Sequence, residues 1–321
     1  MPVSILEPGQ LEPAAGDFPT RRLPARGLFA ARARRLCALA PGHGMAPLLR
    51  FASQLAACQE QQWEGLAPPS LPSAGQLAGC RAAGMAPLAA PGWWPAADWH
   101  DLVRRLATDV AAVAPAPALL DRVATARGDW LETQARALLA GTGDGLDLAA
   151  APIIGAALQV CWTAAAARLT PGDLAPAGLG EAPRAQCPVC SSPPVAAIQR
   201  CSGAEAGLRY LHCGLCATEW HAVRAQCSLC GNSRGVAYLS LADAAATPGP
   251  HQSQPPPPAL QAEVCPQCRG YLKLCRLERD PQADPWADDL ATLALDLLVD
   301  HEGFARAGLN FLLLQSSAAA P

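Results

Sequence analysis

The stretch "YLHCGLCATEWHAVRAQCSLCG", residues 210–231, contains two C-x-x-C pairs that are separated by only ten residues. A C-x-x-C turn brings two sulfur atoms to one point, so each turn supplies two of the four ligands of a tetrahedral thiolate site. The stretch therefore holds either one complete site or one half of each of two sites.

Two further pairs lie outside this stretch, and the complete set is Cys187/Cys190, Cys213/Cys216, Cys227/Cys230 and Cys265/Cys268. Ribbon-type sites usually leave about 15–20 residues or more between their two pairs. The first and second pairs are 22 residues apart, and the third and fourth are 34 apart. This spacing favours sequential pairing into two closed sites. Cross-braced pairing, first with third and second with fourth, stays open as an alternative.

Cysteine usage and charge limit the classes of protein to consider. The chain has fourteen cysteines and no N-terminal secretory pattern, which favours thiolate–metal chemistry in a reducing compartment over a disulfide framework. Residues 149–168 carry no charge before Arg168, but they are mostly alanine, so they predict a buried helix rather than a membrane insertion. The net charge of −3 gives no overall attraction to nucleic acid.

The first half of the chain is predicted to be helical. Helices are expected over residues 27–40, 45–63, 99–113, 118–140 and 152–169, a loop over 66–97 and a linker over 170–186. The clearest case is 99–113, where Trp99, Leu102, Leu106 and Val113 belong to one apolar stripe. We expect an all-helical domain over residues 1–180 and a four-cysteine-pair domain over residues 181–321.

The second half has shorter segments. Strands are predicted near 195–199, 208–212 and 236–241, and a proline-rich loop over 246–259. A final amphipathic helix is expected within residues 286–303, with its leucines on one side and its aspartates on the other. The leucines are Leu290, Leu293, Leu297 and Leu298, and the aspartates are Asp288, Asp289, Asp296 and Asp300. The predicted class is α+β, a helical domain followed by tandem rubredoxin-like or zinc-ribbon-like modules.

Four segments together resemble one known family. They are "CPVCSSPP" (187–194), "RYLHCGLCATEWHAVRAQCSLCG" (209–231), "EVCPQCRGYLK" (263–273) and "DPWADDLATLALDLLVDHEGFARAGLNFLLL" (284–314). They look like the FdhE family of formate dehydrogenase accessory proteins, over about residues 20–315. The resemblance implies a cytoplasmic protein that is needed to form active respiratory formate dehydrogenase and that binds its catalytic subunit.

The resemblance also bears on the metal. Spacing alone favours zinc, whereas the resemblance implies iron in two mononuclear four-cysteine centres, so zinc stays open. The implied ligands are Cys187, Cys190, Cys213, Cys216, Cys227, Cys230, Cys265 and Cys268. One departure concerns the residues that follow three of the pairs, Ser191, Ala217 and Arg269, where glycine would ease the turn.

We expect no enzymatic activity, because a closed four-thiolate site leaves no coordination position for substrate. One alternative is an electron-transfer double rubredoxin. Another is a zinc-ribbon nucleic-acid-binding protein, suggested by the arginines at 21, 22, 26, 32, 34 and 35. Residues 181–321 hold ten basic and thirteen acidic residues, which disfavours that alternative. A homodimer is possible.

Three further features have two interpretations each. His212 and His221 flank the pairs and are either ligands or neighbours of the sites, and the second is favoured because eight thiolates already suffice. Trp220 is either packed under a metal turn, which we favour, or an anchor for a partner protein. Asp288, Asp289 and Asp296 form either an acidic face for a partner or an ordinary solvated face.

Overall fold

The computed structural model of this protein describes residues 18–95, 98–114, 116–141, 145–175, 185–241 and 258–314. Most of the predicted linker over 170–186 and of the proline-rich loop over 246–259 lies outside these ranges.

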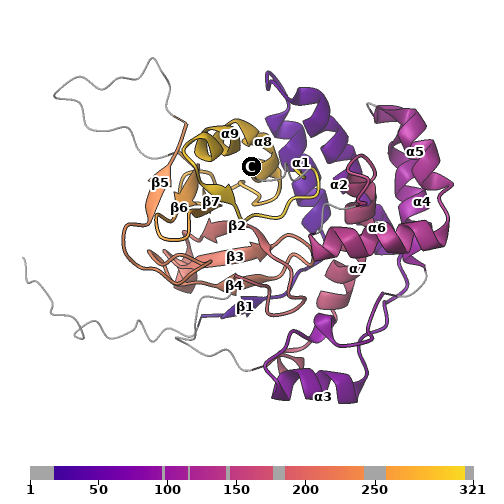
Figure 1. The fold of residues 1–321 in the computed structure, drawn as a ribbon, viewed down its shortest axis with the longest axis horizontal. Helices are drawn as coiled ribbons and strands as arrows, with labels where there is room; N and C mark the ends of the chain where they lie inside the picture. Colours follow the sequence, from indigo (N-terminus) through magenta and orange to yellow (C-terminus); the bar gives the residue numbers. More distant parts are fainter. Residues whose placement is uncertain are drawn as a thin grey trace, which may run out of the picture.

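The first half of the described chain is mainly helical, as expected (Figure 1). Its helices are α1 (Leu28–Leu39), α2 (Ala46–Gly65), α3 (Ala74–Ala82), α4 (Trp99–Val110), α5 (Pro117–Ala124), α6 (Gly128–Ala140) and α7 (Ala151–Ala166). The apolar stripe of α4 is buried from Trp99 to Val110, as its periodicity predicts. Val113 is 50% exposed, because the chain leaves the α-helix after Val110 and tightens into a 3₁₀ turn over residues 111–113.

Two local predictions in this half were wrong. Residues 66–97 contain α3, whose first turn is fixed by Ser73: its hydroxyl accepts a bond from the Gln76 backbone N–H, and the Gln76 side chain accepts from the Ser73 N–H. This capping box was visible in the sequence as S-x-x-Q. The single helix expected over 118–140 is two helices, α5 and α6, which are separated by residues 125–127.

Helix α7 lies in the main core, and nearly all of its side chains are buried. Small side chains allow neighbouring segments to approach closely. A Cβ atom added at Gly155 would stand 2.5 Å from the ring of Phe311 in the C-terminal segment. The prediction of a buried helix is confirmed, and none of the helices in the described ranges has the length and apolarity needed to cross a bilayer.

The described strands form one sheet in the order β1-β4-β3-β2-β7-β6-β5, with β8 beside β7 (Figure 1). Their bounds are β1 (Arg21–Arg22), β2 (Pro194–Gln199), β3 (Arg209–Cys213), β4 (Glu219–His221), β5 (Ala237–Leu239), β6 (Leu260–Val264), β7 (Gly270–Arg276) and β8 (Ala305–Arg306). β2, β3 and β4 pair antiparallel, as do β5, β6 and β7. Parallel pairing of β2 with β7 joins the two units.

The helical half and the cysteine half are joined by a strand pair and by a common hydrophobic cluster. The short strand β1 comes from the helical half and pairs with β4 of the other half. One hydrophobic cluster joins side chains of α4 and α7 to Leu211, Leu272 and Leu274 of the sheet. The division into domains 1–180 and 181–321 therefore stays a prediction.

The C-terminal helix differs most from its prediction. It is broken at Thr292 into α8 (Ala287–Ala291) and α9 (Leu293–His301). Leu297 and Leu298 are 58% and 55% exposed, so they do not belong to a buried stripe. The expected solvated aspartate face is also wrong, because Asp288, Asp289 and Asp296 are all buried. The reason is that arginine and lysine side chains from other segments pair with these carboxylates inside the protein.

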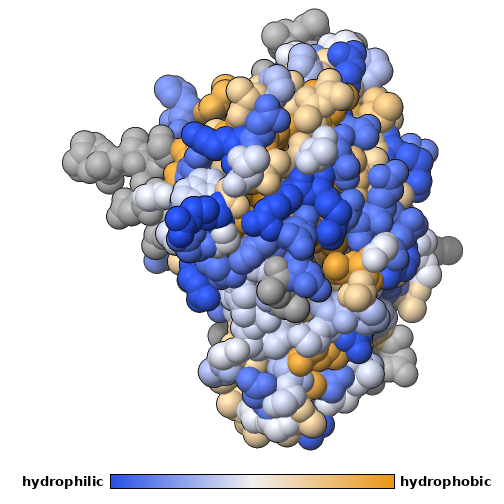
Figure 2. Space-filling model, turned by 90° about the vertical axis from the view of Figure 1, so that its right-hand side faces the viewer, coloured by the Kyte–Doolittle hydropathy of each residue, from blue (hydrophilic) through white to orange (hydrophobic). Residues whose placement is uncertain are grey.

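The outer face of the helical half is mostly hydrophilic. Figure 2 shows apolar residues on this face as small patches that are separated by charged and polar side chains. Isolated apolar residues of this kind are ordinary on protein surfaces, so they indicate no broad binding face here.

Candidate metal centres

The eight paired cysteines gather into two groups of four. Cys187, Cys190, Cys213 and Cys216 form the first cysteine centre, and Cys227, Cys230, Cys265 and Cys268 form the second cysteine centre. Within each group all sulfur atoms lie within 4.8 Å of one another. The pairing is sequential rather than cross-braced, so residues 210–231 hold one half of each centre.

The distances between sulfur atoms test whether a metal ion fits. In the first cysteine centre the Cys187–Cys216 and Cys190–Cys213 Sγ distances are 3.6 and 3.4 Å. In the second, the Cys227–Cys268 and Cys230–Cys265 distances are both 3.7 Å. Metal–sulfur bonds of about 2.3 Å give a tetrahedron with edges of about 3.8 Å, whereas a disulfide bond measures about 2.0 Å. Both groups therefore match thiolate cages for one tetrahedral ion, and their soft donors suit zinc or iron.

Each C-x-x-C turn follows the same backbone path. The residue after the second cysteine has a positive φ in every case: 63° at Ser191, 56° at Ala217, 79° at Gly231 and 56° at Arg269. For a residue other than glycine this conformation costs roughly 1–2 kcal/mol. Ser191, Ala217 and Arg269 therefore adopt the turn that glycine would ease.

Backbone N–H groups in these turns point at sulfur. The N–H groups of Val189 and Leu215 donate to Cys187 and Cys213 Sγ, and the N–H of Leu229 donates to Cys227 Sγ, each at 3.4 Å. Bonds of this kind stabilise the thiolate relative to the thiol, and the thiolate is the form that binds a metal ion.

Helix α7 and a neighbouring turn enclose the first cysteine centre, whose four cysteines are all buried. The Gln159 side chain donates to the Gly214 carbonyl at 2.7 Å, inside the second turn of the centre. The Leu88 N–H donates to the Val189 carbonyl at 2.8 Å, inside the first turn. The centre is thus part of the protein core. The contact of Gln159 was not expected, although a glutamine within an uncharged, alanine-rich helix was the available signal.

The second cysteine centre lies at the surface. Cys227 and Cys265 are buried, but Cys230 and Cys268 are exposed. The Asn232 side-chain amide donates to Cys265 Sγ at 3.8 Å.

Proton affinities of the thiols also differ within each centre. In the second, burial opposes ionisation of Cys265, but backbone N–H groups of Cys268 and Gln267 bring its pKa to about 6. Burial raises the pKa of Cys227 to about 12. In the first, burial raises the pKa of Cys187 and Cys213. A metal ion binds the thiolate form, so an ion bound in either centre would displace the protons of the thiols whose pKa is raised.

Family models cover most of the chain. The model described as FdhE, N-terminal, matches residues 18–178, the FdhE central domain matches 186–224, and the FdhE C-terminal domain matches 225–313. The chain belongs to the FdhE family. The resemblance to that family, seen in the three cysteine-bearing segments and in residues 284–314, is thereby confirmed.

Individual FdhE proteins align over nearly the whole chain. A protein FdhE homolog of Pseudomonas aeruginosa is 41% identical over 319 residues, which cover 97% of each chain. A homolog of Pseudomonas putida is 40% identical over 314 residues, covering 96% of this chain and 94% of the relative. The crystal structure of the FdhE protein from Pseudomonas aeruginosa superposes with a TM-score of 0.74 at 37% identity, over 93% of this chain and 100% of that one.

In this FdhE-family chain, neither His212 nor His221 belongs to one of the two four-cysteine groups. His212 is buried, and its Nδ1 lies 3.5 Å from a Glu219 carboxylate oxygen. The His221 ring packs against Phe18 and Tyr210. Trp220 is buried in the main core, which agrees with the packing interpretation rather than with an exposed anchor.

The N-terminal arginines are largely engaged within the protein. Arg22 pairs with Glu205 at 2.6 Å, and Arg35 pairs with Asp288 at 2.5 Å. Arg32 is buried between Phe29 and Trp286. These contacts leave few of the arginines available to phosphate groups.

Proposed function

We propose that this chain is a cytoplasmic accessory protein, not an enzyme, that assists the formation of respiratory formate dehydrogenase by binding its catalytic subunit. We further propose that each cysteine centre holds one iron ion. The observation that carries the proposal is the pair of closed four-sulfur cages within a member of the FdhE family. The catalytic subunit and the iron follow from the family resemblance of the three cysteine-bearing segments and of residues 284–314.

The geometry supports a binding role over catalysis. In each centre four thiolates complete the tetrahedral coordination of an ion and leave no position for a substrate. A bound ion would cross-link segments that are 22 or 34 residues apart in sequence, and iron would also supply a one-electron couple. The chain's own residues enclose the first cage and present the second at the surface.

Anaerobic purification followed by metal analysis and visible spectroscopy tests the metal assignment. We expect two iron ions per chain and the red absorption of ferric thiolate. A colourless protein that contains two zinc ions would overturn iron while leaving the cages intact.

Binding to the purified catalytic subunit of a formate dehydrogenase tests the partner. We expect the wild-type protein to bind and Cys230→Ser to bind at least tenfold more weakly, because the exposed second centre would lose its shape. Cys37→Ser, which changes an exposed cysteine outside both centres, is the matched control and should bind normally. No binding by the wild-type protein would refute the partner assignment.

Electron transfer is the second candidate, and one observation favours it. Cys230 and Cys268 are exposed, so a donor or acceptor would be able to approach the second centre closely. This candidate requires reversible one-electron redox at the rate at which a physiological partner turns over. It gives no role to the helical half, and we therefore favour the accessory function.

A further inference from the structure

Helix α9 presents leucine to solvent and aspartate to the interior. Leu297 and Leu298 are more than half exposed, whereas Asp296, which directly precedes them in the chain, is buried. Full burial of one leucine side chain contributes about 1.5–3 kcal/mol. Two adjacent exposed leucines on a helix of nine residues therefore forgo stability that a bound partner would recover.

A cavity of about 220 Å³ lies beside Leu297, between α9 and the C-terminal segment. Its walls include four leucines, Leu293, Leu297, Leu313 and Leu314. One water molecule needs only about 10–15 Å³ by this kind of measure, so the cavity has room for a large side chain. We call this feature the α9 groove.

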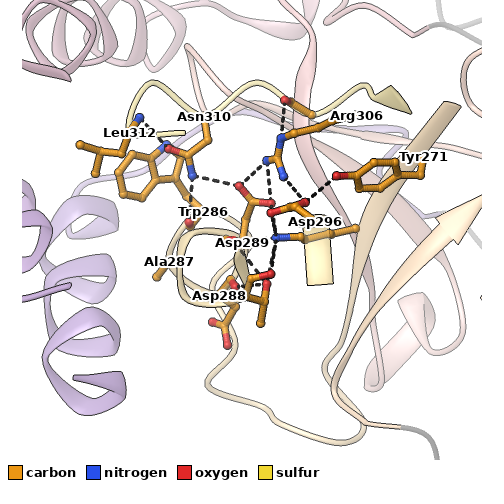
Figure 3. Close-up of polar contacts among 12 residues, drawn as sticks. Tyr271, Trp286, Ala287, Asp288, Asp289, Asp296, Arg306, Asn310 and Leu312 are labelled. Atoms are coloured by element: carbon orange, nitrogen blue, oxygen red, sulfur yellow. Dashed lines mark hydrogen bonds and ion pairs between the residues drawn. The ribbon is translucent and has the colours of Figure 1, made fainter. Parts of the chain in front are cut away.

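The floor of the α9 groove is rigid and electrically balanced (Figure 3). Asp296 accepts bonds from Tyr271 at 2.8 Å, from Lys273 at 2.6 Å and from Arg306 at 2.6 Å. Asp289 accepts a second pair of bonds from Arg306, at 2.6 and 2.7 Å. Two carboxylates thus balance two cations, and these groups have little capacity left for a charged ligand. The floor instead fixes the positions of the apolar walls.

Carboxylate groups lie at the mouth of the groove. Asp300 lines the cavity, and neither Asp300 nor Glu302 has a side-chain partner among the residues that the structure describes. Both lie at the C-terminal end of α9, where the partial negative charge of the helix disfavours carboxylates and favours cations. His301 is exposed on the same turn. The guanidinium of Arg269 is engaged with the Glu302 and Gly303 carbonyls and the Phe304 ring.

We propose that the α9 groove docks a segment of a partner protein in which a large apolar side chain stands next to an arginine or lysine. The apolar side chain enters between the leucine walls, and the cation pairs with Asp300 at the mouth. Resting on the proposed function, the inference assigns this segment to the catalytic subunit. Arg269 directly follows Cys268 and donates to the Gly303 carbonyl at 3.1 Å, so the chain just after α9 is tied to the second cysteine centre.

Other occupants fit less well. The chain continues after Leu314 as "QSSAAAP", which has neither a large apolar side chain nor a basic residue. A second copy of this chain would have to supply an available arginine beside an apolar residue, and many of its arginines are already paired.

Affinity for the purified catalytic subunit, measured with the full-length protein by titration calorimetry, tests the groove. We expect Leu297→Ser to weaken binding about tenfold and Asp300→Asn to weaken it about threefold while reducing its dependence on salt. Leu241→Ser and Asp121→Asn change an exposed leucine and an exposed aspartate elsewhere, and both should bind as the wild type does.

Synthetic peptides separate failure of the groove from failure of the proposed function. Peptides that carry Leu-Arg or Phe-Arg should bind the wild-type protein, and Leu-Glu or Phe-Glu peptides should not. If the subunit does not bind but Leu297→Ser abolishes binding of the basic peptides, the groove stands and the choice of client is wrong. The groove is refuted if Leu297→Ser and Asp300→Asn change neither measurement. It is also refuted if removing residues 315–321 opens it to the peptides, or if Leu297→Ser alters only self-association.

Discussion

The first cysteine centre is enclosed by α7 and the main core, whereas the second has two of its four sulfurs at the surface. Their local geometries are nearly the same, including the positive φ after each pair and the N–H bonds to sulfur. Local sequence therefore sets the cage, and the neighbouring segments set its exposure. We infer that the first centre mainly stabilises the fold, and that the second is available for exchange or contact.

Loss of one cysteine ligand should give the largest difference in folding between the two centres. Cys216→Ser removes a thiolate of the first centre that is 0% exposed, and Cys230→Ser removes an exposed thiolate of the second centre. Structural zinc sites contribute roughly 10–16 kcal/mol, comparable with the whole stability of a domain, so Cys216→Ser should not fold. Cys230→Ser should stay soluble with one metal ion per chain. Circular dichroism and metal analysis check both results, and equal behaviour of the two variants would contradict the comparison.

Glycine substitutions next to the cysteines should give a smaller difference in stability between the two centres, and the first centre should again be affected more. A Cβ at Gly214, in the first centre, would stand 2.5 Å from the Leu309 carbonyl oxygen, and backbone cannot move aside easily. A Cβ at Gly270, after the second centre, meets the end of the Leu229 side chain, which can rotate. We expect Gly214→Ala to cost about 3 kcal/mol and Gly270→Ala about 1 kcal/mol in chemical denaturation.

Gly79→Ala is the control for this pair. No atom lies within 4 Å of a Cβ added there, in the middle of α3, so alanine should stabilise the helix by about 0.5–1 kcal/mol. Greater tolerance at Gly214 than at Gly270 would show that the first centre is not the more tightly enclosed.

Removal of metal by a chelator should proceed in two phases. The exposed sulfurs of the second centre allow direct attack, whereas the first centre must open first. We expect the ion of the second centre to leave at least tenfold faster than the ion of the first centre. This ratio corresponds to a difference of about 1.4 kcal/mol between the two barriers. The fast phase should be absent in Cys230→Ser. A single phase that coincides with unfolding would mean that the two centres open together.

Periodicity was a good guide where packing on one face decides the structure. Helix α4 has its apolar residues at helical spacing, and the structure buries them up to Val110. The same reasoning failed in α8 and α9, because it assumed that aspartate faces water. Asp289 and Asp296 are instead neutralised by Lys273 and Arg306, which come from other segments. A pattern within one helix has no information about cations that arrive from elsewhere in the chain.

The amino-acid sequence by itself determined the eight sulfurs, their grouping in pairs and the helical character of the first half, since these depend on spacing over a few residues. It favoured sequential pairing of the C-x-x-C turns without excluding the alternative. The tertiary structure decided which cage is buried, which way α9 faces and where the α9 groove opens. These properties depend on contacts between segments far apart in the chain, and burial of charge or leucine is fixed only when those contacts form.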